Sequence, residues 1–94
     1  MDSNGYNGSV FPTGRCYICG RYGDLVRHEV FHGPNRKKSK ELGCWVELCP
    51  SCHMDLHENP ADYRWLQREC QEKAMVWHRW GVKEFRDVFG KSYL

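Results

Sequence analysis

Two pairs of cysteines have the spacing of a metal site. Cys16 and Cys19 form one C-x-x-C pair, and Cys49 and Cys52 form the other. Each pair can present two thiolates to an ion, and four thiolates complete the tetrahedral shell of a structural Zn²⁺. Independent buried thiols are the alternative, but two such pairs seldom arise by chance in so short a chain. The spacing therefore predicts a structural zinc site, and the 29 residues between the pairs must fold as a large excursion.

Three histidines form a second candidate metal site. His53 and His57 are four residues apart directly after the second cysteine pair, so on a helix both imidazoles project from one face. His28 lies on an expected strand that the intervening chain brings back toward that helix. Three neutral imidazoles that leave coordination positions open are typical of a catalytic metal site. The alternatives are that these histidines lie on the surface, or that one of them replaces a cysteine at the zinc.

Positive charge gathers between the cysteine pairs. Residues 14–40 hold seven Lys or Arg against two acidic residues, although the formal net charge of the chain is only +2. Four of these cations stand close together, namely Arg36, Lys37, Lys38 and Lys40. We expect them in a loop between two strands, where they contact the phosphates of a nucleic acid without reading its sequence. A solvated loop without a partner is the alternative.

The elements expected to position these residues are short. Strands are predicted over residues 25–31 and 44–49, where branched and aromatic residues recur between turn signals. A helix is predicted over residues 51–58, because Pro50 suits the first helical position, where its missing N–H would have no partner.

A longer amphipathic pattern follows. Residues 61–80 predict one helix, and residues 82–90 predict a shorter one. The apolar face of the long helix is expected to comprise Tyr63, Leu66, Cys70, Ala74 and Trp77. The four tryptophans, Trp45, Trp65, Trp77 and Trp80, are expected to pack in the core or between helices rather than to stack on bases.

Three parts are predicted along the 94 residues. Residues 1–13 carry Gly, Pro, Ser and Asn without an apolar period, and we expect a flexible N-terminal tail. Residues 14–60 contain both metal motifs and are expected to form one metal-binding module. Residues 61–94 are expected to be helices that pack on this module and add the core that so small a domain needs.

Composition excludes several classes of protein. With 40% hydrophobic and 28% charged residues, the chain is expected to be globular. It has no apolar run of about 18 residues and no secretory signal, so we expect no membrane partner and an intracellular location with reduced cysteines. A disulfide scaffold would need an oxidising compartment and would leave the histidine spacing unexplained.

The order CYIC, RHEVFHG and CWVELCPSCHMDLH resembles the zinc-knuckle branch of the HNH endonucleases, and is most similar to small phage-type HNH proteins. The resemblance covers residues 14–60. It implies an α+β fold, with a small zinc-stabilised ββα-metal, treble-clef-like core and a C-terminal helical extension. It also implies a metal-dependent hydrolase that cleaves the phosphodiester bonds of DNA in the cytoplasm of a bacterial host, and a phage or prophage origin.

The resemblance implies two metal sites. Its structural zinc ligands correspond to Cys16, Cys19, Cys49 and Cys52. The ligands of its catalytic divalent ion, Mg²⁺, Mn²⁺, Ni²⁺ or Zn²⁺, correspond to His28, His53 and His57.

Two positions depart from the family pattern. The general base, commonly a histidine just after the first metal ligand, falls on Glu29, and the asparagine that orients it falls on Cys44. A carboxylate can accept a proton from water, although its pKa of about 4.3 makes it a weaker base than imidazole. The alternative is that Glu29 joins the metal ligands and His32 or solvent is the base. Neighbouring strand residues point to opposite faces, so His28 and Glu29 are expected to have separate catalytic roles.

A catalytically impaired module is the competing hypothesis. It would keep the HNH-like zinc scaffold, lose its chemistry through the two departures, and bind DNA or a protein partner.

Overall fold

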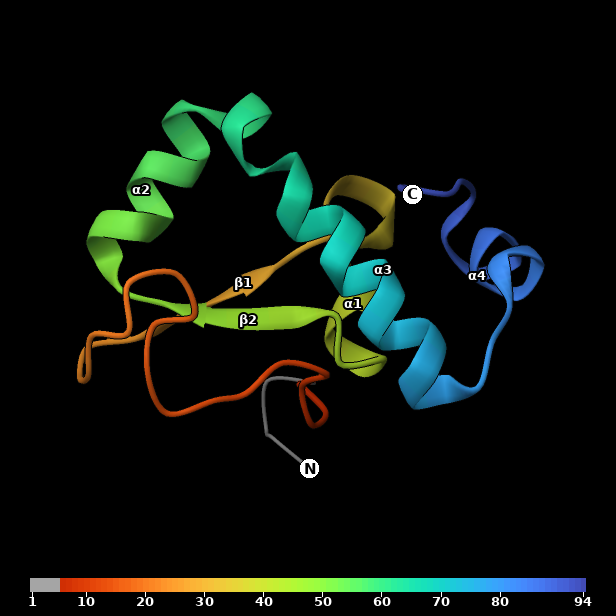
Figure 1. Ribbon diagram of the computed structural model, residues 1–94, viewed down its shortest axis with the longest axis horizontal. Coiled ribbons are helices and arrows are strands. Elements are labelled where there is room, and N and C mark those ends of the chain that lie inside the picture. The colour runs from red at the N-terminus through yellow and green to blue at the C-terminus, as the bar shows by residue number, and fades with distance from the viewer. Residues whose placement is uncertain (1–5) are drawn as a thin grey trace.

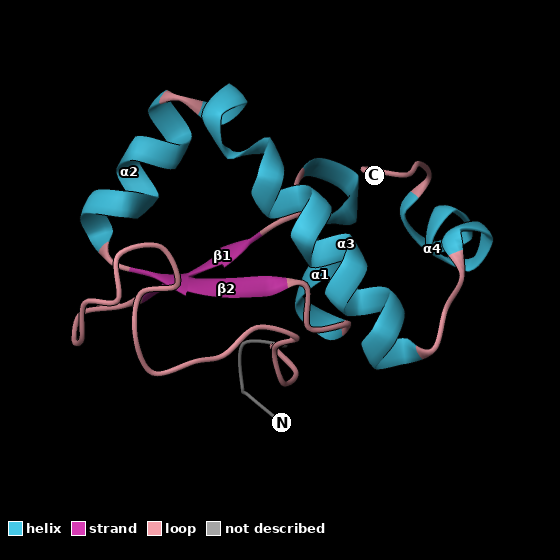
Figure 2. Cartoon of the chain, viewed as in Figure 1, coloured by secondary structure: helices cyan, strands magenta, loops and turns pink. Residues whose placement is uncertain are grey.

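Two short strands pair as an antiparallel ribbon, with helices α2 and α3 on one side of it and the N-terminal segment on the other (Figures 1 and 2). The computed structural model describes residues 6–94. Over this range the chain is α+β, with one two-stranded sheet and four α-helices. The elements in order are β1 (Val26–Glu29), the 3-10 helix η1 (Gly33–Asn35), α1 (Arg36–Glu41), β2 (Trp45–Leu48), α2 (Pro50–Glu58), the 3-10 helix η2 (Pro60–Tyr63), α3 (Arg64–His78) and α4 (Val82–Phe89).

The register of the ribbon sorts its side chains into two faces. His28 pairs with Val46, and Glu29 pairs with Trp45. Successive strand residues point to opposite faces, so His28 shares a face with Val46 and Leu48, while Glu29 shares the other with Trp45. Val46 and Leu48 are fully buried in the core. The first face is therefore the core face, and His28 sits at its edge.

The predicted basic loop is a helix instead. Residues 36–41 form α1, which follows the single turn of η1. Its one buried residue is Ser39, whose hydroxyl accepts the N–H of Phe31 at 3.1 Å and donates to the carbonyl of Cys44 at 3.0 Å. A helix that buries a single small residue has no apolar period, so the sequence pattern could not reveal it.

The long C-terminal pattern forms α3 and α4. The predicted helix over residues 61–80 is found with narrower bounds, because residues 60–63 form η2 and Arg79 closes α3 in the left-handed conformation. The buried residues of α3 are Leu66, Cys70, Gln71 and Ala74. Three of these, Leu66, Cys70 and Ala74, share one core cluster with Phe85 and Phe89 of α4 and with the ribbon residues described above. The C-terminal helices thus share one core with the ribbon.

The expected packing of the tryptophans holds for only part of the set. Trp45 is buried, and Trp80 is half-buried, with its ring stacked 4.4 Å from that of His78. Trp65 and Trp77 are 43% and 61% exposed, so the prediction is wrong for both. Trp77 lies three residues beyond Ala74 but is left at the surface, although Met75 and Trp80 on either side of it pack against the core.

Residues 6–14 cover the second face of the ribbon. The indole N–H of Trp45 donates to the carbonyl of Asn7 at 2.6 Å. The backbone N–H of Val10 donates to the carbonyl of Gly43 at 2.9 Å. These contacts place the N-terminal segment against β2 and the turn before it, as Figure 1 shows in red and orange.

This packing contradicts the prediction of a flexible tail over residues 1–13 for the residues that the structure describes. Residues 6–13 lie against the ribbon, and Phe11 is only 3% exposed within the core cluster. A single buried aromatic produces no period, and so the segment resembled a tail in the sequence. Residues 1–5 lie outside the described part of the chain.

Between residues 6 and 94, no helix combines the length and apolar character needed to cross a bilayer.

Candidate metal centres

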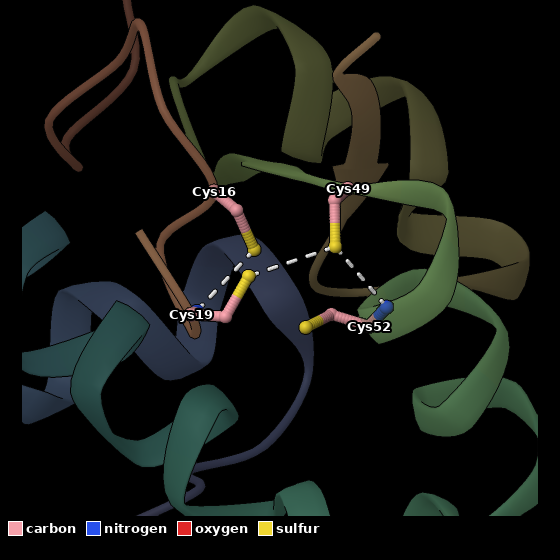
Figure 3. Close-up of side chains that lie close together, drawn as sticks. All are labelled: Cys16, Cys19, Cys49 and Cys52. Carbon is pink, nitrogen blue, oxygen red and sulfur yellow. Dashed lines mark hydrogen bonds between the residues drawn. The ribbon is translucent and has the colours of Figure 1, made fainter. Parts of the chain in front are cut away.

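The four thiols of the two C-x-x-C pairs converge on one point (Figure 3). Their sulfur atoms all lie within 4.8 Å of one another, and the Sγ atoms of Cys19 and Cys49 are 3.7 Å apart. A tetrahedral Zn²⁺ with Zn–S bonds of about 2.3 Å requires sulfur atoms about 3.8 Å apart. The donor set and its spacing therefore fit a structural zinc ion, and this cluster could hold one.

A tight knuckle positions the first pair. The backbone N–H of Gly20 donates to the carbonyl of Cys16 at 2.8 Å, and Gly20 adopts a φ of +80°, which a residue with a side chain rarely accepts. The N–H of Tyr17 donates to the carbonyl of Glu47 on β2 at 3.0 Å. The turn therefore presents both thiols from a loop that is fastened to the ribbon.

The start of α2 positions the second pair. Cys49 is the N-cap of this helix, and its Sγ accepts the backbone N–H of Cys52 at 3.4 Å. Pro50 follows at the first helical position, as predicted. A thiolate at a helix N-terminus is also stabilised by the helix dipole. The same sulfur thus begins the helix and faces the other three thiols.

The thiols differ in how readily they ionise. Burial opposes ionisation of Cys16, but backbone N–H groups, led by that of Cys19, outweigh it and lower the pKa of this thiol to about 6. The N–H of Cys52 likewise lowers the pKa of Cys49. Burial and the neighbouring thiols raise the pKa of Cys52. Some thiols therefore ionise readily while the last resists, and a divalent cation at the centre would remove that resistance.

The three predicted histidines also converge. Ring nitrogens of His28, His53 and His57 lie within 4.8 Å of one another, and the Nε2 atoms of His53 and His57 are 3.0 Å apart. Ligands at about 2.1 Å from one ion are separated by about 3.0–3.4 Å. His53 and His57 come from successive turns of α2, and His28 reaches them from β1. This cluster could hold a metal ion, and its open side faces solvent, because His57 is exposed.

The environment favours the neutral form of two of these imidazoles, His28 and His53. Burial, followed by the charges of His32 and His53, lowers the pKa of His28 to about 3. Burial and His57 lower the pKa of His53 in the same direction. Neutral imidazole is the form that binds a metal, so burial favours the state that these two donors need.

A fourth imidazole stands beside this cluster. The ring of His32 is 5.0 Å from that of His28 and 6.5 Å from that of His57, centroid to centroid. Burial, and then the charge of His57, lower its pKa. A small hollow of about 40 Å³, large enough for a water molecule, is lined by His28 and His32 together with Tyr63 and Gln67.

Glu29 is occupied by other partners. Its Oε1 accepts the Nε–H of Arg36 at 2.6 Å, and the hydroxyl of Tyr6 also bonds to the carboxylate. Burial alone would raise the pKa of Glu29, but these hydrogen bonds outweigh it and hold the pKa below its ordinary value. Sequence reasoning missed Tyr6, because it lies in a stretch that resembled a tail and no spacing relates it to Glu29.

Cys44 is enclosed in the core. It is 0% exposed, and its Sγ lies 4.0 Å from the carbonyl of Leu42. The buried thiol of Cys70 is also a neighbour. A thiol in this position faces other apolar groups and cannot orient a catalytic base as an amide would.

The four predicted phosphate-binding cations lie on or beside α1 and differ in their partners. Lys37 pairs with Glu41 at 3.9 Å along the helix, and the Nζ of Lys38 donates to the carbonyl of Val88 at 2.7 Å. Lys40 lies 5.1 Å above the ring of Tyr6. Arg36 is the one that reaches Glu29. The structure therefore groups these cations on one short helix. Its first residue, Arg36, contacts Glu29, which directly follows His28 in β1.

Comparison with known proteins gives one informative likeness. The chain is 32% identical over 76 residues to the mitochondrial DNA mismatch repair protein mutS homolog of Sarcophyton glaucum. The aligned part covers 77% of this chain but only 8% of that protein, so the likeness is to a small segment of a much longer relative. No family profile matches the chain, and no solved structure matches it.

Proposed function

We propose that this chain is a metal-dependent endonuclease of the HNH type, with a ββα-metal core, that cleaves phosphodiester bonds of DNA. The observation that supports it most is the meeting of His28 with His53 and His57 beside a separate cluster of four cysteines. Strand β1 supplies His28 and helix α2 supplies His53 and His57, which is the arrangement that the resemblance to zinc-knuckle HNH endonucleases implies.

Two further observations support DNA as the substrate. The relative reported above is named as a DNA mismatch repair protein. The cations of α1 lie next to the histidine cluster along the chain, and the side chains of Arg36 and Lys37 are 67% and 86% exposed. Exposed cations beside a metal centre can hold a phosphate backbone in position.

The residues divide the work as follows. Cys16, Cys19, Cys49 and Cys52 would hold a structural Zn²⁺ that fixes the start of α2. The three imidazoles would hold a second divalent ion, which supplies polarisation of the scissile phosphate and stabilisation of the departing oxygen when bound.

His32 is proposed as the proton acceptor. Its ring adjoins His28 and lines the hollow, where a water molecule would lie within reach of an imidazole. Its lowered pKa favours the neutral ring, in which one nitrogen carries no proton and is an acceptor. We assign the role of general base to His32 rather than to Glu29, because the carboxylate of Glu29 is already bonded to Arg36 and Tyr6.

A plasmid-nicking assay tests the proposal. Purified chain should convert supercoiled DNA to the nicked form with at least one of Mg²⁺, Mn²⁺, Ni²⁺ or Zn²⁺. His53→Ala should abolish nicking by removing a ligand, whereas His78→Gln should not, because His78 lies outside the cluster and bonds to Leu42. Failure of the wild-type chain with every ion, or nicking that survives His53→Ala, would contradict the proposal.

Two observations favour a second candidate, a zinc module that binds DNA without cleaving it. Cys44 is sealed in the core, and Glu29 is held in an ion pair. This candidate predicts one tightly bound zinc per chain and DNA binding that survives His53→Ala. A second, exchangeable ion in elemental analysis, lost in His53→Ala, would favour the nuclease.

A further inference from the structure

We propose that Glu29 is a positioning residue, which holds the guanidinium of Arg36 so that its free N–H groups grip a substrate phosphate beside the histidine cluster. This inference rests on the proposed function for the identity of the ligand, a DNA phosphate. It assigns Glu29 a role different from that of a general base.

The first observation is how completely Glu29 is enclosed. The residue is 6% exposed, and its carboxylate receives the Nε–H of Arg36 and the hydroxyl of Tyr6. It lies on the face of β1 opposite to His28, under the N-terminal segment. A buried charge with two donors is satisfied, and a water molecule would have to displace one of them to transfer a proton to it.

The second observation is the geometry of Arg36. Glu29 takes only the Nε–H, and the other four N–H groups lie on the two terminal nitrogens. Within residues 6–94 the guanidinium donates to no other group, and its side chain is 67% exposed. The two terminal nitrogens form a planar fork, which suits two oxygens of a phosphate. An anchored fork also loses less entropy on binding than a free one.

The third observation is the location of this pair. Glu29 directly follows His28, and Arg36 is close enough to His32 for its charge to lower the pKa of that ring. A phosphate held by Arg36 would therefore lie on the His32 side of the cluster, and the ring of His32 is 5.0 Å from that of His28. Among the α1 cations, Lys38 is instead directed to Val88 at the end of α4.

Simple charge and the positioning role predict opposite effects. Removing a carboxylate from a DNA-binding surface adds one net positive charge, which by itself tightens binding to an anion. If Glu29 anchors Arg36, removing the Glu29 carboxylate must weaken DNA binding instead. It must do so only in a chain that still contains Arg36.

A double-mutant cycle on DNA binding separates these effects. The probe is a fluorescein-labelled 20-base-pair duplex, and the chain carries His53→Ala throughout so that cleavage does not interfere. Arg36→Met should weaken binding roughly tenfold and reduce the salt dependence by about one phosphate contact. Glu29→Met should weaken binding by a similar factor, and the double variant should be no weaker than Arg36→Met alone.

Three controls complete the cycle. Lys37→Met removes a neighbouring exposed cation and should show no coupling to Glu29→Met, because Lys37 pairs with Glu41. Glu29→Gln keeps a neutral acceptor for Arg36 and should weaken binding less than Glu29→Met does, again only while Arg36 is present, so it replaces Glu29→Met in the cycle if that variant does not fold. Zinc content and the melting temperature report whether each variant is folded.

The outcomes also separate this inference from the proposed function. Two results would overturn the inference even if the wild-type chain cleaves DNA. One is a folded Glu29→Met variant that binds DNA as tightly as the parent. The other is a double variant in which the losses of affinity from the two single substitutions multiply. If the wild-type chain does not cleave, the nuclease proposal fails while the binding cycle still decides the role of Glu29. If it does not bind the duplex at all, both fail.

Kinetics give an independent readout if cleavage occurs. Loss of a general base lowers kcat by about 10²–10⁴-fold, whereas loss of a phosphate anchor chiefly raises KM. In a chain with its native His53, Glu29→Gln should therefore raise KM with little change in kcat. A fall in kcat of the size of a lost base, with KM unchanged, would contradict the positioning role.

Discussion

At the scale of single residues, Gly43 controls the approach of two segments that are far apart in sequence. It has a φ of +77°, and a Cβ built on it would lie 2.3 Å from the carbonyl oxygen of Gly8. That distance is far inside van der Waals contact, and neither atom can turn aside, because the Cβ position is fixed by the backbone and the oxygen belongs to the backbone. The close approach is what allows Val10 to donate to Gly43. Only glycine is compatible with this packing of the N-terminal segment.

Gly43→Ala is accordingly expected to destabilise the chain well beyond the cost of backbone conformation. Gly90 is the matched control, because it has a φ of +87° and a Cβ added to it would meet nothing within 4 Å. Gly90→Ala should cost about 1–2 kcal/mol, the conformational penalty alone. Gly43→Ala should cost more by the free energy of displacing the N-terminal segment, measured by urea unfolding. Equal losses in the two variants would show that this segment contributes nothing to stability.

The same scale explains which site residues could be predicted. The cysteine and histidine clusters follow from spacing, because a C-x-x-C turn and an i, i+4 helical pair each bring two ligands together locally. The partners of Glu29 do not follow from spacing. Tyr6 is 23 positions away on a segment without a pattern, and Arg36 reaches the carboxylate only because η1 and α1 turn the chain back.

At the scale of elements, the C-terminal helices show what an apolar period reveals and where it fails. Phe85 on α4 is 0% exposed, and its ring lies 5.5 Å from that of Phe31, which follows β1. Trp77 continues the apolar period of α3 but is 61% exposed. The period predicts which residues share a helix face, but the elements that pack on this face decide which of its residues are buried. Sequence alone does not supply the position of those elements.

Two substitutions measure this difference. Phe85→Ala should cost about 3–5 kcal/mol, because it empties a site at the centre of the aromatic cluster. Trp77→Gln should change stability by no more than about 0.5 kcal/mol, because the side chain has little burial to lose. Urea unfolding of both variants checks the pair. A large loss in Trp77→Gln would mean that the end of α3 is buried in solution.

At the scale of the whole molecule, the cluster of four cysteines connects a loop to the start of α2. The hydrophobic core holds these two segments together only in part. Cys16 and Cys19 stand on a loop, and Cys49 and Cys52 begin the helix that carries two of the three site histidines. A chain of this size has a stability of about 5–14 kcal/mol. The apparent free energy of binding of a structural zinc is about 10–16 kcal/mol in small zinc modules. A zinc ion held by this cluster would therefore contribute as much free energy as the whole expected stability of the chain.

Zinc removal should accordingly unfold the molecule rather than loosen one loop. A strong chelator is expected to abolish the thermal transition followed by circular dichroism, and Cys49→Ala should purify with no zinc at the sulfur site and the same loss of structure. Cys70→Ala is the matched control, because Cys70 is a buried thiol outside the cluster, and this variant should keep its zinc with a modest loss of stability. If the histidine geometry depends on α2 being held by the sulfur cluster, the second ion should also be lost from Cys49→Ala but not from Cys70→Ala. Retention of a cooperative transition after complete removal of zinc would show that the core suffices, and that the sulfur cluster is not what holds α2 in place.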